Sequence, residues 1–418
     1  MNDSSNTSST SNAGTIEHVK ARWADIMSCI GCGDCGYSIR PAVGRYLVCP
    51  VKEAKGPAGF EPTFSRGRMG ILKSLLEGKV ELGAGLVDMA YECTECGSCN
   101  EVCHKTHNPG IVLNTSKWID HVEVWHALRQ DLVASGLAPL GKHAKLLAAM
   151  NDPSMRNPYG EPKANKTTWA AGLPGIVKGS ELVLFAGCTY PLRLPGTLEN
   201  LARVFKAAGR DFSLLEDEWC CGSVALRIGD VVAAKDTILH DIEQVKASGA
   251  KAVFALCAGC YRTMSKDWPA IAGGALPFEV LHVTQVLADI MGKKGISLAP
   301  RVDQKRVAFH DPCHLGRHMH VYEPPRDVIK ALPGTALVEL QRNRGNAWCC
   351  GAGGGVKSQY PALANDIARN RIDEALQAKV DVLLSACPFC EANLKDAVHA
   401  SDARLQVQDI IDHVASLL

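Results

Sequence analysis

The stretch Trp348-Cys349-Cys350-Gly351 repeats Trp219-Cys220-Cys221-Gly222, which lies 129 residues earlier in the chain. Two further pairs of cysteines are separated by almost the same number of residues, 125 and 130, namely Cys188 with Cys313 and Cys257 with Cys387. A near-constant offset is typical of an internal duplication in which the loops have changed length. The C-terminal part of the chain is therefore predicted to contain two related domains.

Both copies show the same alternation of short apolar runs and helical stretches. In the first copy we expect strands at residues 182–186, 252–256 and 278–283, with helices near 198–208 and through Leu287. In the second copy we expect strands at 307–309, 337–340 and 382–385, with helices near 326–332, across 362–377 and at 410–417. Strands that alternate with helices indicate α/β domains.

Each copy contributes five cysteines to what we interpret as one group. The groups are Cys188, Cys220, Cys221, Cys257 and Cys260 in the first copy, and Cys313, Cys349, Cys350, Cys387 and Cys390 in the second. The first cysteine and the last pair of each group follow predicted strands, and parallel sheets bind ligands beyond the carboxyl ends of their strands. A loop with an adjacent glycine can present both sulfurs of a vicinal pair, which a strand cannot. We expect each group to converge at one sheet edge.

Two alternatives compete with metal ligation for these groups. The run Gly351-Ala-Gly-Gly-Gly355 suggests a dinucleotide-binding loop, but it follows Cys-Cys in place of a strand and does not meet the G-x-G-x-x-G pattern. A vicinal pair with a C-x-x-C step also suggests dithiol redox chemistry. Both copies, however, keep all five cysteines, and none of the eighteen in the chain is left over. Metal ligation is the interpretation that uses all of them.

Eight cysteines upstream form two runs that resemble those of bacterial two-cluster ferredoxins. The first is Cys29-Ile-Gly-Cys32-Gly-Asp-Cys35 with Cys49 further on, and the second is Cys93-Thr-Glu-Cys96-Gly-Ser-Cys99-Asn-Glu-Val-Cys103. Three cysteines at positions i, i+3 and i+6 can surround one face of a [4Fe-4S] cubane. Zinc is the alternative, but it favours two C-x-x-C pairs and has no use for a third evenly spaced cysteine.

In such ferredoxins the fourth cysteine of each run binds the other cluster. The resemblance therefore implies two crossed sets of ligands, one of Cys29, Cys32, Cys35 and Cys103, the other of Cys93, Cys96, Cys99 and Cys49. The chain departs from the pattern twice. Thirteen residues separate Cys35 from Cys49 where three are usual, and His104 follows Cys103 where proline is usual.

Four histidines flank Cys313: His310, His314, His318 and His320. A single histidine is ordinarily a packing or surface residue, and that interpretation stays open here. A group of four could instead donate hydrogen bonds to cluster sulfur or deliver protons to a reduced substrate. The sequence identifies none of the four as catalytic.

Changes in composition divide the chain into segments. We predict a disordered tail at residues 1–20, a two-cluster ferredoxin-type domain at 21–150, a linker at 151–180, and cysteine-rich domains at 181–300 and 301–418. Within the ferredoxin-type domain we expect a helix at 69–76 and a covering helix with Trp118, Val122, Trp125, Leu128 and Leu132 on its apolar face. The predicted class is an α+β multidomain protein, with a helical two-cluster domain followed by two repeated α/β domains.

Composition excludes several classes of protein. The chain has 418 residues, 46% of them hydrophobic, which suffices for several cores. Because 45 Lys and Arg are balanced by 44 Asp and Glu, no net field attracts nucleic acid or an anionic membrane. No apolar run approaches the about 18 to 20 residues that span a bilayer, and the absence of a secretory signal argues against disulfides. We expect a cytoplasmic protein, peripheral to a membrane only through a partner.

Taken together, these motifs resemble a known family. Paired five-cysteine groups with Trp-Cys-Cys-Gly, His310-Asp-Pro-Cys-His314 and Cys387-Pro-Phe-Cys390, joined to a two-cluster ferredoxin module, resemble the catalytic D subunit of heterodisulfide reductase. Equivalent modules occur as the separate B and C subunits of the soluble enzyme. The resemblance covers about residues 25–418. Other iron–sulfur subunits share the architecture, often with one motif degraded, whereas both motifs are intact here.

The resemblance implies cofactors and an activity. In that family each five-cysteine motif binds a non-cubane [4Fe-4S] cluster, so the chain is expected to hold two non-cubane clusters besides its two cubanes. We expect an oxidoreductase subunit that receives electrons from a flavoprotein or membrane cytochrome partner and reduces a disulfide or thiol-linked substrate. The alternative is an electron-transfer subunit that relays electrons between such a partner and another enzyme without disulfide chemistry. The sequence names neither substrate nor electron donor.

Overall fold

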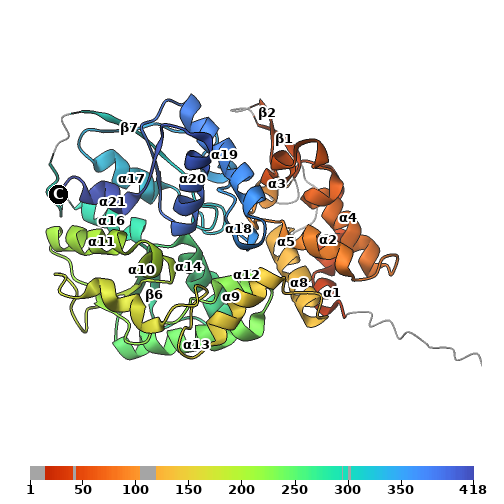
Figure 1. Ribbon diagram of the computed structural model, residues 1–418, viewed down its shortest axis with the longest axis horizontal. Coiled ribbons are helices and arrows are strands. Elements are labelled where there is room, and N and C mark those ends of the chain that lie inside the picture. The colour runs from red at the N-terminus through yellow and green to blue at the C-terminus, as the bar shows by residue number, and fades with distance from the viewer. Residues whose placement is uncertain (1–14, 41–43, 104–118, 294, 300–302) are drawn as a thin grey trace, which may run out of the picture.

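The structure, a computed structural model, describes residues 15–40, 44–103, 119–293, 295–299 and 303–418. A helical N-terminal part, coloured red to yellow in Figure 1, lies beside two α/β domains, the first mostly green and the second mostly blue. Helices of the N-terminal part contact both domains, since α8 packs against α12, and α9 against α12 and α18. The N-terminal part is therefore in contact with both repeats.

The N-terminal part consists of short helices around one hairpin. Its elements are α1 (Glu17–Ala21), α2 (Trp23–Met27), β1 (Tyr37–Arg40), β2 (Gly44–Leu47), α3 (Pro50–Ala54), α4 (Ser65–Leu76), α5 (Val87–Tyr91), α6 (Ser98–Val102), α8 (His121–Ala134) and α9 (Gly141–Asn151). Met69, Leu72 and Leu75 recur at a spacing of three along α4 and are buried in a core with Trp125 and Leu128 of α8. These helices share one hydrophobic core, which lies beside the loops that carry the cysteines.

The first α/β domain has a four-stranded parallel sheet in the order β4-β3-β5-β6. Its elements are β3 (Leu182–Phe185), α10 (Thr189–Arg193), α11 (Pro195–Ala207), β4 (Ser213–Leu214), α12 (Ser223–Ile228), α13 (Val231–Ser248), β5 (Ala252–Ala255), α14 (Ala258–Arg262), α15 (Trp268–Ala272), β6 (Glu279–His282) and α16 (Val283–Gly292). The side chain of Asp230 accepts a hydrogen bond from the backbone N–H of Ala233 and thereby caps α13.

The second α/β domain repeats this topology strand for strand. Its parallel sheet has the order β8-β7-β9-β10, so that β7 and β9 are central as β3 and β5 are in the first. Its elements are β7 (Lys305–Phe309), α17 (Glu323–Ala331), β8 (Thr335–Leu337), α18 (Val356–Gln359), α19 (Pro361–Gln377), β9 (Val382–Ser385), α20 (Pro388–Ser401), β10 (Gln406–Asp409) and α21 (Ile410–Ala415). The predicted fold class, with its duplication, is confirmed.

The two repeats pack on each other with pseudo-two-fold symmetry. Helix α11 of the first repeat packs on α21 of the second, and α17 of the second packs on α16 of the first. Because α11 corresponds to α17 and α16 to α21, each repeat offers the same two helices to the other. Symmetry of this kind places equivalent residues near the axis in contact with each other.

Several predicted boundaries differ from the observed ones. Helix α4 begins at Ser65 instead of residue 69, β8 ends at Leu337 where the predicted strand began, and the short strands β4 and β10 were not predicted. Of the predicted tail, residues 1–14 lie outside the described residues, and α1 begins at Glu17, so that residues 17–20 are helical. Trp118 also lies outside them. Among the residues described, every helix is too short or too polar to cross a membrane.

Candidate metal centres

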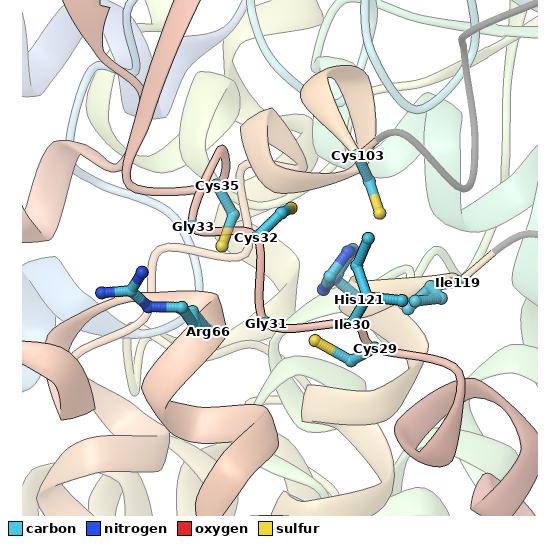
Figure 2. Close-up of a pocket in the computed structure, with 10 residues that line it drawn as sticks. All are labelled: Cys29, Ile30, Gly31, Cys32, Gly33, Cys35, Arg66, Cys103, Ile119 and His121. Carbon is cyan, nitrogen blue, oxygen red and sulfur yellow. The ribbon is translucent and has the colours of Figure 1, made fainter. Parts of the chain in front are cut away.

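The first cavity lies at the surface of the N-terminal part and is lined by cysteines from both ferredoxin-type runs. Figure 2 shows Cys29, Cys32, Cys35 and Cys103 around it, with His121 and Ile119 on one side. Glycines at φ +71° and +88°, Gly31 and Gly33, turn the loop between the first three cysteines so that it wraps around the cavity. Cys103, the residue that follows α6, comes from the second run, and Cys32 is exposed.

The second cavity adjoins the first in the N-terminal part of the molecule. Its lining includes Cys93, Cys96 and Cys99 from the second run and Cys49 from the first. Cys35 lines both cavities, which therefore share a wall. The structure thus brings together the two crossed sets of four cysteines that the ferredoxin pattern implied.

The five cysteines of the first repeat converge beyond the carboxyl edge of its sheet. Cys188 follows β3, the Cys257–Cys260 step follows β5, and Gly222 at φ +85° turns the vicinal pair inward. The thiols form one continuous series of hydrogen-bonded neighbours, in the order Cys188, Cys220, Cys221, Cys260 and Cys257. All five are buried. Hydrogen bonds from Cys220 and Cys260 lower the pKa of Cys221 to about 6.

The second repeat builds the same series, link for link. The order there is Cys313, Cys349, Cys350, Cys390 and Cys387. Gly351, at φ +85° like Gly222, again follows the vicinal pair. The hydrogen bonds from Cys349 and Cys390 lower the pKa of Cys350 well below its ordinary value. Each repeat therefore holds one group of five neighbouring thiols.

The two series meet at their last members. The Cys257 and Cys387 side chains are hydrogen-bonded to each other across the boundary between the repeats. These two residues occupy the same position in their repeats, as expected for a contact near the pseudo-two-fold axis. The ten thiols therefore form one paired site instead of two distant ones.

The second cavity of the N-terminal part adjoins this paired site. The Cys96 side chain is hydrogen-bonded to that of Cys349, and both pack in one small apolar cluster with Val51 and Ile367. The cysteines thus run inward from the surface in the order first cavity, second cavity, second repeat, first repeat. A line of neighbouring sites is the geometry that electron transfer requires.

Buried arginines hold these sites together. Arg129, fully buried on α8, donates hydrogen bonds to the carbonyl oxygens of Cys93 at 2.8 Å, Gly354 at 2.8 Å and Arg227 at 2.6 Å, and so joins all three parts of the molecule. Arg317 donates from Nε to the Cys96 carbonyl at 2.6 Å and from Nη1 to that of Ala347, also at 2.6 Å. The Arg317 guanidinium also places positive charge beside the sulfur of Cys96.

The glycine run after Cys350 is an interdomain contact. A Cβ at Gly353 would lie 2.6 Å from the carbonyl oxygen of Thr94, and one at Gly354 would lie 2.4 Å from that of Cys93. Side chains there would push the N-terminal part away from the second repeat. The run therefore serves close approach of two backbones, which explains its composition without a nucleotide.

The four histidines have different surroundings. A ring nitrogen of His310 and the sulfurs of Cys350 and Cys390 lie within 4.8 Å of one another. A Cβ at Gly259, in the first repeat's C-x-x-C step, would lie 3.7 Å from Nδ1 of His314, and one at Gly97 would lie 3.1 Å from Nε2 of His318. His320 is exposed. The rings of His314 and His318 also contact each other, with centroids 4.6 Å apart. His310 therefore lies beside the second repeat's cysteines, His314 and His318 lie together between the first repeat and the N-terminal part, and His320 lies at the surface.

Sequence reasoning missed Lys166, which lies in the segment predicted to be a linker. Lys166 is buried in the 3-10 helix Lys163–Ala170. Its Nζ lies 2.7 Å from Glu218 Oε1 and donates a hydrogen bond to the Trp219 carbonyl oxygen. Its positive charge also lowers the pKa of Cys188, although the hydrogen bond from Cys220 and burial raise that pKa overall. A lysine in a loop rich in proline and glycine gave no signal that it would be buried.

The donor chemistry fits iron–sulfur clusters. All eighteen cysteines are free thiols, so no disulfide accounts for their grouping. Burial raises the pKa of Cys49 to about 11, against the lowering effect of Arg68, and burial followed by repulsion from Cys96 and Cys93 raises that of Cys99 well above its ordinary value. Thiolates crowded in this way are stable only around bound cations.

Comparisons with known proteins agree with this chemistry. A family described as a 4Fe-4S dicluster domain matches residues 25–107, and one described as a cysteine-rich domain matches residues 182–265 and again 307–395. The D subunit of the dihydromethanophenazine:CoB–CoM heterodisulfide reductase of Methanosarcina acetivorans is 37% identical over 410 residues, which cover 94% of each chain. The B subunit of a CoM/CoB fumarate reductase of Methanothermobacter marburgensis is 29% identical over 93% of this chain and 72% of that one.

A more distant relative is EtfAB:quinone oxidoreductase of Syntrophomonas wolfei, 28% identical over 75% of this chain but only 44% of its own length. Fold, cysteine groups and comparisons together define an iron–sulfur oxidoreductase. Within that class the chain belongs to the family of the heterodisulfide reductase D subunits.

Proposed function

We propose that this protein carries electrons through two [4Fe-4S] cubanes to a pair of non-cubane [4Fe-4S] clusters that reduce a disulfide or thiol-linked substrate. The observation that carries the proposal is the contact between Cys257 and Cys387, which joins the two five-cysteine groups into one site. The cubanes would be held by Cys29, Cys32, Cys35 and Cys103, and by Cys49, Cys93, Cys96 and Cys99. The non-cubane clusters would be held by Cys188, Cys220, Cys221, Cys257 and Cys260, and by Cys313, Cys349, Cys350, Cys387 and Cys390.

The order of the sites supports inward electron flow. Cys32 is exposed, Cys35 is shared between the two cavities, and Cys96 contacts Cys349 of the second repeat. When bound, the clusters supply one-electron carriage, which no side chain provides. The protein contributes short separations, buried arginines and exclusion of water.

Reduction of a disulfide needs two electrons and two protons and yields two thiols. A relay needs one terminal site, whereas a disulfide has two sulfurs that must both be stabilised as the bond breaks. Two equivalent sites in contact, each with its full set of five cysteines, match that demand. The substrate would approach at the boundary between the repeats, on the pseudo-two-fold axis.

Electrons would come from a flavoprotein or a membrane cytochrome partner. The names of two relatives describe them as the D and B subunits of larger reductases, which supports a partner of this kind. In this proposal the chain is cytoplasmic and reaches a membrane only through that partner. The second candidate is an electron-transfer subunit without disulfide chemistry, which the similarity to EtfAB:quinone oxidoreductase favours.

The two functions are distinguished by the product. The reconstituted protein, reduced with an artificial donor under anaerobic conditions, is mixed with a panel of low-molecular-weight and coenzyme-linked disulfides. Thiol release within one turnover supports the proposal. Rapid reoxidation by a quinone or an electron-transfer flavoprotein, with no thiol from any disulfide, would favour the relay.

A further inference from the structure

His310 marks a difference between the two repeats, because the first repeat has no histidine at the equivalent position. It follows Phe309, the last residue of β7, and the residue that follows Phe185 at the end of the corresponding strand β3 is Ala186. At that position the first repeat has only a backbone N–H, which donates to Glu218 Oε2 at 2.7 Å. The second repeat alone has an imidazole there, beside Cys350 and Cys390.

The two ring nitrogens of His310 have different surroundings. Arg371 Nε donates a hydrogen bond to Nδ1 at 3.2 Å, while Nε2 is buried and has no nitrogen or oxygen partner among the described residues. The His310 side chain interacts instead with the Cys350 thiol. Because Nδ1 accepts a hydrogen bond from Arg371, the tautomer of the neutral ring that fits this contact carries its proton on Nε2. His310 is therefore a fully buried donor without a nitrogen or oxygen acceptor, next to two cysteine sulfurs.

Arg371 is held firmly in this role. Its Nη1 donates to Glu374 Oε2 at 2.7 Å and to the carbonyl oxygen of Arg342 at 2.7 Å, and the side chain is fully buried. If Nε2 of His310 bound iron, the ring proton would move to Nδ1 and face the N–H of Arg371. Two donors would then oppose each other. The arrangement favours donation by His310 over ligation.

We propose that His310 donates from Nε2 to a sulfur of the second non-cubane site, either the Cys350 thiolate or a cluster sulfide. The inference rests on the proposed function, since it requires a cluster at that site. A hydrogen bond to sulfur stabilises the more negative, reduced state and so raises the reduction potential. Ala186 offers no such donor at the equivalent position of the first repeat, so this contribution acts on the second site alone, and its loss should lower the reduction potential of that site.

The test is an anaerobic redox titration followed by electron paramagnetic resonance. The Cys221→Ser background disables the first site, so that only the second gives a non-cubane signal. His310→Ala removes the donor, His310→Gln keeps an N–H, and His320→Asn is the matched control at an exposed histidine of the same segment. We expect His310→Ala to lower the midpoint reduction potential of the second site by about 59 mV. For a one-electron couple this shift corresponds to a tenfold change in the ratio of reduced to oxidised cluster at a given potential. His310→Gln should recover most of that shift, and His320→Asn should cause none.

Each other outcome has a distinct meaning. If the second-site signal has the same midpoint potential in the Cys221→Ser protein with and without His310→Ala, the inference is overturned. The proposed function would remain intact. Loss of the cluster in both His310→Ala and His310→Gln would identify His310 as a ligand and also overturn it. If the Cys221→Ser protein with His310 intact shows no non-cubane signal, the proposed function itself fails.

Discussion

Cys257 and Cys387 lie side by side and share a hydrogen bond, although 130 residues separate them in the sequence. They are equivalent residues of two repeats, and their contact places the two five-cysteine groups on a common axis. Duplication followed by two-fold packing thus converts one metal-binding domain into a paired site. The paired site is what a substrate with two equivalent sulfur atoms requires.

Cluster content follows from the four groups of cysteines. Four clusters of four irons imply about sixteen iron atoms per chain, with a similar amount of acid-labile sulfide, after anaerobic reconstitution. Iron and sulfide analysis of the intact protein measures this. About eight irons in a fully reconstituted sample would contradict the assignment of clusters to the five-cysteine groups while leaving the ferredoxin-type ones.

Crossed ligation predicts which substitutions act alike. Cys103→Ser should perturb the same spectroscopic signal as Cys32→Ser, because both residues line the first cavity, and Cys49→Ser should perturb the same signal as Cys96→Ser. Electron paramagnetic resonance of the four variants separates the two groups. If Cys103→Ser instead behaved like Cys96→Ser, ligation would follow sequence proximity.

The sequence was informative where chemistry is local or repeated. The resemblance of the first two cysteine runs to those of two-cluster ferredoxins implied the crossed sets around the two cavities, and the offset between repeats predicted two related α/β domains. Parallel sheets then implied that Cys188 and Cys257 would converge. The convergence of the five-cysteine groups needed only the spacing, the periodicity and the rule for ligands at sheet edges, whereas the crossed sets rested on the ferredoxin resemblance.

The contacts between domains could not be predicted from the sequence. Nothing in the spacing of Cys96 and Cys349 indicates that they touch, because that contact depends on how a helical part packs against an α/β domain. Lys166 was hidden in a segment with the composition of a linker. The glycines at 353 and 354 suggested a ligand loop, whereas the neighbouring backbone of Cys93 and Thr94 is what requires them.

Gly354 provides a test of that packing. Gly354→Ala would place a Cβ 2.4 Å from the Cys93 carbonyl oxygen, whereas Gly78→Ala meets nothing within 4 Å; both residues have positive φ, +61° and +70°. Both variants place an alanine in the left-handed region and share that backbone strain. The difference between them therefore measures the clash of the new Cβ at residue 354 with the Cys93 carbonyl oxygen. We expect Gly354→Ala to cost about 1–3 kcal/mol more in the free energy of unfolding. If urea unfolding showed the same loss of unfolding free energy for both variants, the backbones at Gly354 and Cys93 would not be in tight contact.

Glu95 should make stability depend on pH. Burial raises the pKa of this carboxyl, but Arg129 and His126 outweigh it and lower the value from 4.5 to about 2. Arg129 Nη1 lies 3.0 Å from Glu95 Oε1. A lowered pKa stabilises the folded state fully above pH 4.5, and the contribution disappears as pH falls toward 2.

The corresponding variant is Glu95→Gln, which we expect to lose about 3 kcal/mol of unfolding free energy at pH 7. The deficit should shrink as pH falls below 4.5, where wild-type Glu95 begins to take up a proton. Glu216→Gln, which breaks an exposed pair with Lys178, is the control and should change nothing measurable. A deficit independent of pH would mean that the effect of Glu95→Gln is one of packing alone.

The most direct test of the paired site is a single-turnover measurement of thiol release by the wild type, Cys221→Ser, Cys350→Ser, and an equal mixture of the two variants. Each substitution disables one member of a cooperating pair, so their effects should be strongly non-additive. We predict two thiols for every two electrons in the wild type. We predict none in either variant and none in the mixture, because neither protein contains both sites. Thiol release by one variant alone, at the rate of the wild type, would contradict a paired site.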